Sequence, residues 1–94
     1  MPNKRTFTFI NDPAHAWLQV TQADLSKLGI IAERTFSDYS FRSPDMTMYY
    51  LEEDCDAPKF LRLWTETFGA PIVAEQYHDG PAPCRNLPRI QTVT

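Results

Sequence analysis

The sequence has little cysteine, no long apolar run and no strong excess of charge of either sign. Its two cysteines, Cys55 and Cys84, lie in unlike contexts with no short repeat spacing, which favours free thiols over a disulfide framework. No stretch approaches the roughly 18 apolar residues of a membrane helix, and the N-terminus lacks the apolar segment of a signal peptide. These absences predict a cytoplasmic protein that does not bind to membranes.

The charge balance is mildly acidic. Nine Lys and Arg residues against twelve Asp and Glu residues give a net charge of −3 over 94 residues. This charge disfavours nucleic acid as a partner, because binding to phosphates requires a basic surface. A hydrophobic content of 43% is enough to offset the chain entropy that is lost on folding. We therefore predict one folded domain, residues 1–94.

Motifs for catalysis and metal binding are also missing. No CxxC or HxxxH spacing is present, and no triad motif surrounds His15 or His78. The run from Glu52 to Asp56 lacks the central glycine and the final glutamate of an EF-hand loop. Flanking carboxylates disfavour the thiolate of Cys55. The sequence therefore predicts no catalytic residue, no metal and no cofactor.

Alternating apolar residues and turn signals predict five strands and two helices. The predicted strands are 6–10, 15–20, 35–42, 46–53 and 72–77, and the predicted helices are 21–29 and 57–68. After the first strand the order is β-α-β-β-α-β, which is the split-βαβ plan. The sequence therefore predicts an α+β, ferredoxin-like fold, in which an antiparallel sheet carries two helices on one face and an extra strand comes first.

Two local signals support these helices, and the periodicity then ends. Thr21 and Asp24 have the spacing of a capping box at the start of the first helix, and Gly29 is suited to its end. Beyond His78 the chain is rich in proline, so residues 78–94 are predicted to form an extended tail or surface strap. Arg85 and Arg89 in this tail are interpreted as solubilising charges.

The stretch YYLEEDCDAPKFLRLW places four carboxylates and one thiol in five consecutive positions. Asp56 precedes Ala57-Pro58, which predicts that it caps the N-terminus of the second helix. The positive end of the helix dipole also stabilises nearby carboxylates. The other acidic residues, Glu52, Glu53 and Asp54, are candidates for a binding patch that imitates nucleic-acid phosphates toward a basic channel.

Aromatic residues are expected on the helix-free face of the sheet. Trp17 lies on a strand next to that of Tyr49 and Tyr50, so one tyrosine is expected beside it. RNA-recognition sheets stack bases on such a platform, but the basic surround and the RNP pattern are missing here. An exposed aromatic face on an acidic protein instead predicts a protein contact, with a partner or with a second copy.

Three segments, HAWLQVTQADLSKLGI, DYSF and YYLEEDCDAPKFL, resemble a group of small uncharacterised proteins carried by phages, plasmids and other mobile elements. Members of that group read approximately GHGWLEV, a helix ending LGI, SxYSY and YLEEDCDxxxF, which corresponds to residues 12–68 here. This chain has AHAW in place of GHGW, and its tail RNLPRIQTVT departs from the arginine and tyrosine ending of the group. The resemblance implies a mobile-element setting. Small acidic proteins from that setting are often inhibitors of a host defence complex, anti-CRISPR proteins among them.

The leading hypothesis is a non-catalytic protein that binds and inhibits a host defence complex, such as a CRISPR-Cas complex, in the host cytoplasm. Binding is assigned to Trp17, Glu52, Glu53 and Asp54. Two alternatives stay open. One is a small thiol- or metal-dependent enzyme built on His15, Cys55 and Asp56, and the other is an RNA-binding sheet protein.

Overall fold

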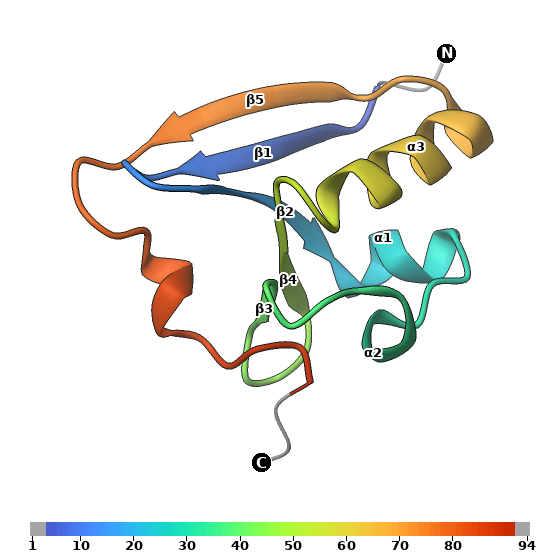
Figure 1. Cartoon of the computed structure of the whole chain (residues 1–94). Coiled ribbons are helices and arrows are strands. Elements are labelled where there is room, and N and C mark those ends of the chain that lie inside the picture. The colour runs from blue at the N-terminus through green and yellow to red at the C-terminus, as the bar shows by residue number, and fades with distance from the viewer. Residues whose placement is uncertain (1–3, 92–94) are drawn as a thin grey trace.

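A computed structural model describes residues 4–91 and places five strands in one mixed sheet (Figure 1). The strands are β1 (Thr6–Asn11), β2 (Ala16–Thr21), β3 (Phe41–Arg42), β4 (Met48–Glu52) and β5 (Ile72–Tyr77). The helices are α1 (Gln22–Lys27), α2 (Ala32–Thr35) and α3 (Ala57–Phe68), with a 3-10 turn η1 (Pro83–Asn86). The predicted α+β class is confirmed.

The strand order of the sheet is β3-β4-β2-β1-β5. Without β1, this is the strand order of the split-βαβ plan, so the extra N-terminal strand is inserted between β2 and β5. The prediction of a wholly antiparallel sheet is wrong, because β1 pairs antiparallel with β2 and parallel with β5, with Phe7 opposite Val73.

The local helix signals are confirmed. The side chain of Thr21 accepts a hydrogen bond from the Asp24 N–H at 3.1 Å, and the Asp24 carboxylate accepts one from the Thr21 N–H at 2.9 Å, which completes the capping box. Gly29 has a φ of 68°, as expected of a glycine that ends a helix. The predicted helix 57–68 matches α3.

The predicted strand 35–42 is wrong for most of its length. Only Phe41–Arg42 pairs as a strand, and Ala32–Thr35 forms the short helix α2. The physical reason lies between them, where Ser37 and Ser40 both donate hydrogen bonds to the carboxylate of Asp56. These bonds hold the chain in a turn and prevent it from extending along the sheet.

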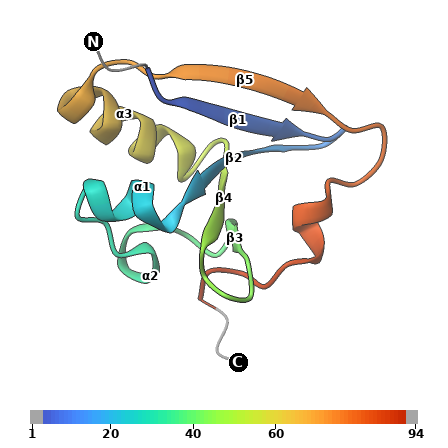
Figure 2. The ribbon, with the colours of Figure 1, turned by 180° about the vertical axis from the view of Figure 1, so that it is seen from behind.

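All three α-helices cover one face of the sheet (Figures 1 and 2). The main core on this face includes Phe7, Leu18, Val20, Leu51, Phe60 and Trp64. Phe68, at the end of α3, lies outside this core and is 53% exposed. None of the helices within residues 4–91 has the length and apolar character that crossing a membrane requires.

The opposite face of the sheet is covered by residues 78–91, here called the C-terminal strap (Figure 1). Ala82 and Cys84 of the strap pack with Ile10, Trp17 and Phe41 in a second buried cluster.

The strap then runs beside β3. The Arg42 N–H donates to the Pro88 carbonyl at 2.9 Å, and the Ile90 N–H donates to the Ser40 carbonyl at 3.2 Å. The last three residues of the predicted segment 78–94, and residues 1–3 of the predicted domain, lie outside the described range. The helix-free face is therefore not the open surface that the sequence suggested.

Candidate functional site

A pocket of about 420 Å³ opens between the helix-free face of the sheet, the C-terminal strap and the loop after β4. We call it the strap pocket. It is lined by His15, Trp17, Tyr39, Phe41, Glu52, Asp54, Cys55, Arg85 and Arg89. The structure therefore brings together three of the four predicted binding residues, and the fourth, Glu53, lies next to them in the chain.

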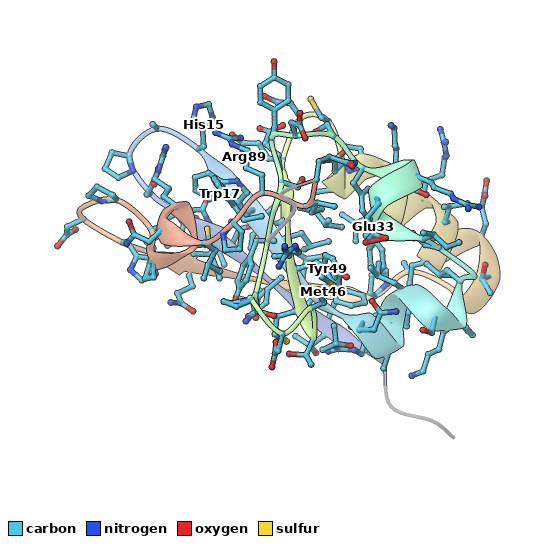
Figure 3. All side chains as sticks on the ribbon, turned by 90° about the horizontal axis from the view of Figure 1, so that it is seen from below. His15, Trp17, Glu33, Met46, Tyr49 and Arg89 are labelled. Atoms are coloured by element: carbon cyan, nitrogen blue, oxygen red, sulfur yellow. The ribbon has the colours of Figure 1, made fainter. Side chains whose placement is uncertain are left out.

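The floor of the strap pocket is aromatic. Trp17 and Phe41 pack with ring centroids 5.9 Å apart. Trp17 lies on the predicted face but is only 2% exposed, because the strap covers it. The expectation of an exposed Trp17 anchor is thus wrong, and the residue instead forms part of the pocket wall. Figure 3 shows His15, Trp17 and Arg89 gathered in one region.

Arg85 places a guanidinium group on this floor and fixes the strap. Its Cζ atom lies 4.8 Å from the centroid of the Trp17 ring, which is within the range of a cation–π interaction. Its Nε donates to Asp12 at 2.6 Å, and Asp12 also accepts from the Ala82 N–H at 3.0 Å. The hydrogen bond from Arg85 holds the pKa of Asp12 well below its usual range. The Arg85 charge is therefore neutralised within the protein.

Arg89 is in a different electrostatic situation. Its Cζ atom lies 5.1 Å from the centroid of the Phe41 ring, and its Nη1 donates to the carbonyl of Asp38. Within residues 4–91, Arg89 has no carboxylate partner. Tyr39, beside it in the pocket wall, is 63% exposed. The pocket thus presents one cation without an acidic partner and one exposed aromatic ring.

On the acidic side of the pocket, Glu52 has a structural role. It is buried, and its Oε1 accepts hydrogen bonds from the N–H groups of Asp54 at 3.0 Å and Cys55 at 2.9 Å. The carboxylate therefore closes the loop between β4 and α3. This engagement corrects the assignment of Glu52 to an exposed acidic patch.

Asp56 is also structural, although not in the predicted way. It occupies the N-cap position of α3, but its side chain makes no capping hydrogen bond. The fully buried carboxylate instead accepts from the Ser37 N–H at 3.0 Å, from the Ser37 hydroxyl at 2.7 Å and from the Ser40 hydroxyl. The predicted capping role of this side chain is wrong, because the loop before β3 supplies its partners.

Glu53 and Asp54 remain as the solvent-accessible carboxylates of the run. Asp54 is exposed, and Glu53 is partly exposed with its Oε1 3.9 Å from Nδ1 of His15. We call these two residues the acidic rim of the strap pocket. They carry the negative charge that a partner can reach at this loop.

One group of side chains has the spacing of a metal site. Ligand atoms of His15, Glu52 and Glu53 all lie within 4.8 Å of one another. The Oε1 atom of Glu52 already accepts two N–H groups, however, so loop closure accounts for its position. The cluster identifies the residues that would hold a cation, but it does not by itself define a metal centre.

The two thiols are poorly suited to nucleophilic chemistry. Partial loss of hydration and the neighbouring Glu52 carboxylate raise the pKa of the Cys55 thiol, although the residue as a whole is exposed. Burial raises the pKa of Cys84 to about 11. Because the thiolate is the reactive form, both thiols are less reactive at neutral pH than a free cysteine.

We therefore expect Cys55 to react slowly with an alkylating reagent. At pH 8 its rate should fall below that of a cysteine in an unfolded peptide, and the midpoint of the pH–rate profile should lie above about 8.5. Mass spectrometry of the modified peptide identifies which cysteine has reacted. A midpoint near neutral pH would contradict this prediction and favour the thiol-enzyme alternative.

Sequence reasoning missed the residues that complete the pocket. Arg85 and Arg89 were interpreted as solubilising charges, but both stack on aromatic rings. Tyr39 and Phe41 were assigned to a strand and given no role in binding. The available signal was the spacing of apolar residues in the tail, where Ala82, Cys84 and Ile90 are all buried. When these three residues of the tail pack on the sheet, the arginines that lie between them in the sequence are also held close to the sheet.

Comparisons with protein-family models, with curated proteins and with solved structures find no match to this chain.

Proposed function

We propose that this protein is a non-catalytic inhibitor, encoded by a mobile element, that binds a host defence complex such as a CRISPR-Cas complex in the host cytoplasm. Its contact surface is the strap pocket with its acidic rim. The mobile-element setting comes from the sequence resemblance. The geometry supports the binding part of the proposal.

The observation that carries the proposal is the composition of the strap pocket. Exposed Tyr39 and Arg89, which has no carboxylate partner among residues 4–91, border a floor of Trp17 and Phe41. Tryptophan, tyrosine and arginine are the residue types that contribute most to protein–protein binding energy. Their large side chains and their hydrogen-bonding groups allow a small concave site to bind a partner side chain without catalysing a reaction.

The acidic rim supports a role in partner approach, on a smaller scale than the sequence suggested. Glu53 and Asp54 are available to a partner, whereas Glu52 and Asp56 are engaged inside the protein. Two carboxylates can attract a basic surface and increase the association rate. Imitation of a nucleic-acid backbone would then involve two negative charges at this loop.

The alternatives have less support. The raised pKa of Cys55 disfavours a thiol nucleophile. The strap covers Trp17, so the sheet face does not present the stacking platform of an RNA-binding sheet. The cluster of His15, Glu52 and Glu53 is the remaining observation that favours a metal protein, and it depends on a carboxylate that already closes a loop.

A phage infection assay tests the proposal. Bacterial strains that each carry one defined defence system are challenged with a phage that the system restricts, with and without expression of this protein. We expect plaque formation to be restored in at least one strain. Replacing Tyr39 and Arg89 together by Ala should weaken binding to the purified complex by about thirtyfold or more, because both belong to the hot-spot residue types. The same double variant should lose protection of the phage.

Matched variants control this assay. Tyr77→Ala with Arg62→Ala removes an exposed tyrosine and an exposed arginine away from the strap pocket and should retain full inhibition. Glu53→Lys with Asp54→Lys should slow association, most clearly at low salt. Melting curves confirm that each variant is folded. If no defence system is relieved, or if both double-alanine variants behave alike, the inhibitor proposal is wrong.

A further inference from the structure

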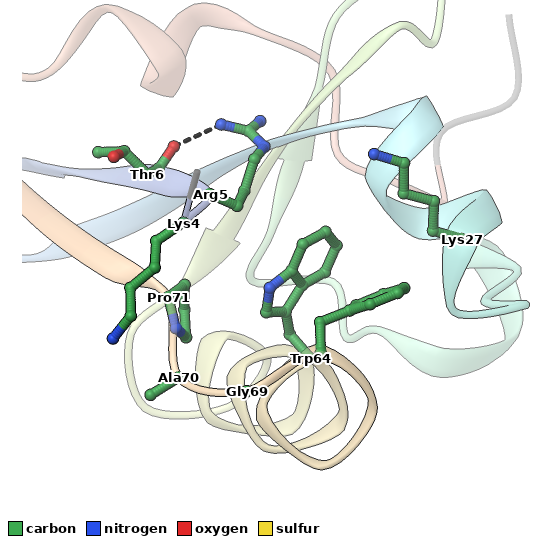
Figure 4. Close-up of a pocket in the computed structure, with 9 residues that line it drawn as sticks. Lys4, Arg5, Thr6, Lys27, Trp64, Gly69, Ala70 and Pro71 are labelled. Atoms are coloured by element: carbon green, nitrogen blue, oxygen red, sulfur yellow. Dashed lines mark hydrogen bonds between the residues drawn. The ribbon is translucent and has the colours of Figure 1, made fainter. Parts of the chain in front are cut away.

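A second and larger cleft, of about 980 Å³, lies at the other end of α3 (Figure 4). We call it the lysine cleft. It is lined by Lys4, Arg5, Thr6, Lys27, Trp64, Phe68, Gly69, Ala70 and Pro71. The twelve residues of α3 span about 18 Å, so this cleft and the loop of the acidic rim are well separated. The proposed inhibitor function does not use it.

The charge of the lysine cleft is positive, in contrast to the whole chain. Lys4 and Lys27 have no ion-pair partner within the part of the chain that the structure describes. Arg5 is neutralised by Asp24, which accepts its Nη2 at 2.8 Å and its Nε at 3.1 Å. No carboxylate is among the residues that line the cleft in the described chain. Two unneutralised lysines therefore face a ligand in a protein whose net charge is −3.

The apolar part of the lysine cleft is aromatic and accessible. Trp64 packs edge-on against Phe7, with centroids 5.0 Å apart, and contacts the ring of Phe68 at 4.6 Å. Phe68 is 53% exposed, so its ring is free to stack with a planar ligand. The small residues Gly69 and Ala70 follow it, and a side chain at Gly69 would meet no atom within 4 Å. The space beside the rings is open.

The two lysines are arranged around this aromatic pair. Nζ of Lys27 lies 6.0 Å from the centroid of the Trp64 ring. Figure 4 shows Lys4 and Lys27 on opposite sides of Trp64. A matching ligand therefore combines one planar group with two anionic groups that extend to opposite sides. A nucleotide with phosphates at both its 5′ and its 3′ positions has this form, because the sugar that carries its planar base also carries one phosphate on each side.

We propose that the lysine cleft binds a nucleotide that carries a phosphate on each side of its sugar, with the base against Phe68 and the phosphates near Lys4 and Lys27. Stacking on an exposed aromatic ring combined with lysine contacts to phosphates is a recurrent way of holding unpaired nucleotides. The same chemistry occurs in a free nucleoside bisphosphate and in a single strand. We expect binding to be weak, because the cleft neutralises only two phosphates and the overall charge of the protein adds no further attraction.

The test uses the purified, isotope-labelled protein and no host component. Adenosine 3′,5′-bisphosphate and a single-stranded oligodeoxyadenylate are titrated while the two tryptophan indole N–H signals are followed by NMR. We expect the Trp64 signal, assigned with Trp64→Phe, to shift on binding while the Trp17 signal stays in place. A plot of the logarithm of the oligonucleotide binding constant against the logarithm of the salt concentration should have a slope of about −1.4. This value is expected when two phosphates of a single strand are contacted.

Variants and ligand controls complete the experiment. Lys4→Ala and Lys27→Ala should each reduce the salt slope by about 0.7, whereas Lys59→Ala, on the first turn of α3, should not change it. Phe68→Ala should weaken binding by about tenfold. Equal binding of the bisphosphate and the oligonucleotide would assign the site to free nucleotides, and much tighter binding of the oligonucleotide would assign it to single strands.

Three outcomes would overturn the proposal. One is the absence of any Trp64 shift at ligand concentrations of about 5 mM, well above the range of weak specific binding. Another is that adenosine 5′-monophosphate, which lacks the 3′ phosphate, or pyrophosphate, which lacks the base, binds as tightly as the bisphosphate. The third is an acidic peptide that shifts the same signal as strongly. None of these results bears on inhibition through the strap pocket, which the infection assay tests separately.

Discussion

Replacing Asp56 by Ala is expected to lower the free energy of unfolding by about 3 kcal/mol, because it leaves buried hydrogen-bond donors unpaired around a former charged acceptor. The carboxylate accepts from the Ser37 N–H and from the hydroxyls of Ser37 and Ser40. The Ser40 hydroxyl in turn accepts from the Glu52 N–H at 2.9 Å. One substitution therefore disturbs the loop before β3, the end of β4 and the start of α3 together.

Thermal unfolding measures this effect. For a domain of this size, a loss of about 3 kcal/mol corresponds to a fall in Tm of roughly 12 to 24 °C. Asp54→Ala is the matched control, because Asp54 is exposed and only two residues from Asp56. The Tm of this variant should differ from that of the wild type by no more than a few degrees. If the two variants melted together near the wild-type temperature, the buried network would not be important for stability.

Replacing Asp12 by Ala is expected to have a comparable effect by releasing the strap from the hairpin of β1 and β2. Asp12 accepts from the N–H groups of Ala14 and His15 and, across the molecule, from Ala82 and Arg85. The Asp12 side chain is only 1% exposed. Hydrogen bonds to a charged group contribute about 1.5 to 3 kcal/mol each, so a net loss of about 2 to 4 kcal/mol is expected after the structure relaxes around the substitution. The emission of Trp17 should also shift to longer wavelength as water reaches the ring.

The dependence on pH gives an independent measurement of the same contact. The hydrogen bond from Arg85 lowers the pKa of Asp12 in the folded protein, so the unfolded chain binds a proton more readily. The stability from this group is complete above the unfolded pKa of about 3.9 and is lost as the pH falls below it. Between pH 4 and pH 2, Asp12→Asn should therefore lose less stability than the wild type.

A control variant isolates the strap contact from general changes in charge. Asp79→Ala removes an exposed carboxylate from the same segment and should keep the wild-type Tm and tryptophan emission. If Asp12→Ala left Trp17 emission unchanged while lowering Tm, the hairpin turn alone would explain the loss and the strap would be held by other contacts.

The sequence predicted the elements that depend on near neighbours. The capping box of Thr21 and Asp24, the bounds of α3 and the end of the first helix at Gly29 all arise from interactions within a few residues. Apolar alternation also predicted the strand 15–20, which matches β2 and carries Leu18 and Val20 into the core. These features need no knowledge of the rest of the chain, and for that reason a single sequence was enough.

The parts that could not be predicted depend on residues far apart in the chain. Asp12 and Arg85 are separated by 73 positions, and Ser37 and Asp56 by 19, without a local pattern that indicates their pairing. The acidic run was therefore interpreted as more exposed than it is, since the partners of Asp56 were unknown. The covering of Trp17 was missed for a related reason, because the apolar residues of the tail indicate that one side of it is buried but not which face of the sheet it contacts.

The insertion of β1 between β2 and β5 also has a consequence for how the chain acquires its fold. Thr6 pairs with Ile72 and Asn11 with Tyr77, so the parallel ladder joins segments 66 residues apart. Contacts of such long range slow folding, because a large loop must close before they contribute any stabilisation. On the ribosome, β1 can pair early with β2, but its other edge must wait until residues 72–77 have been synthesised. Until then, the backbone groups along that edge stay open to solvent and to other chains.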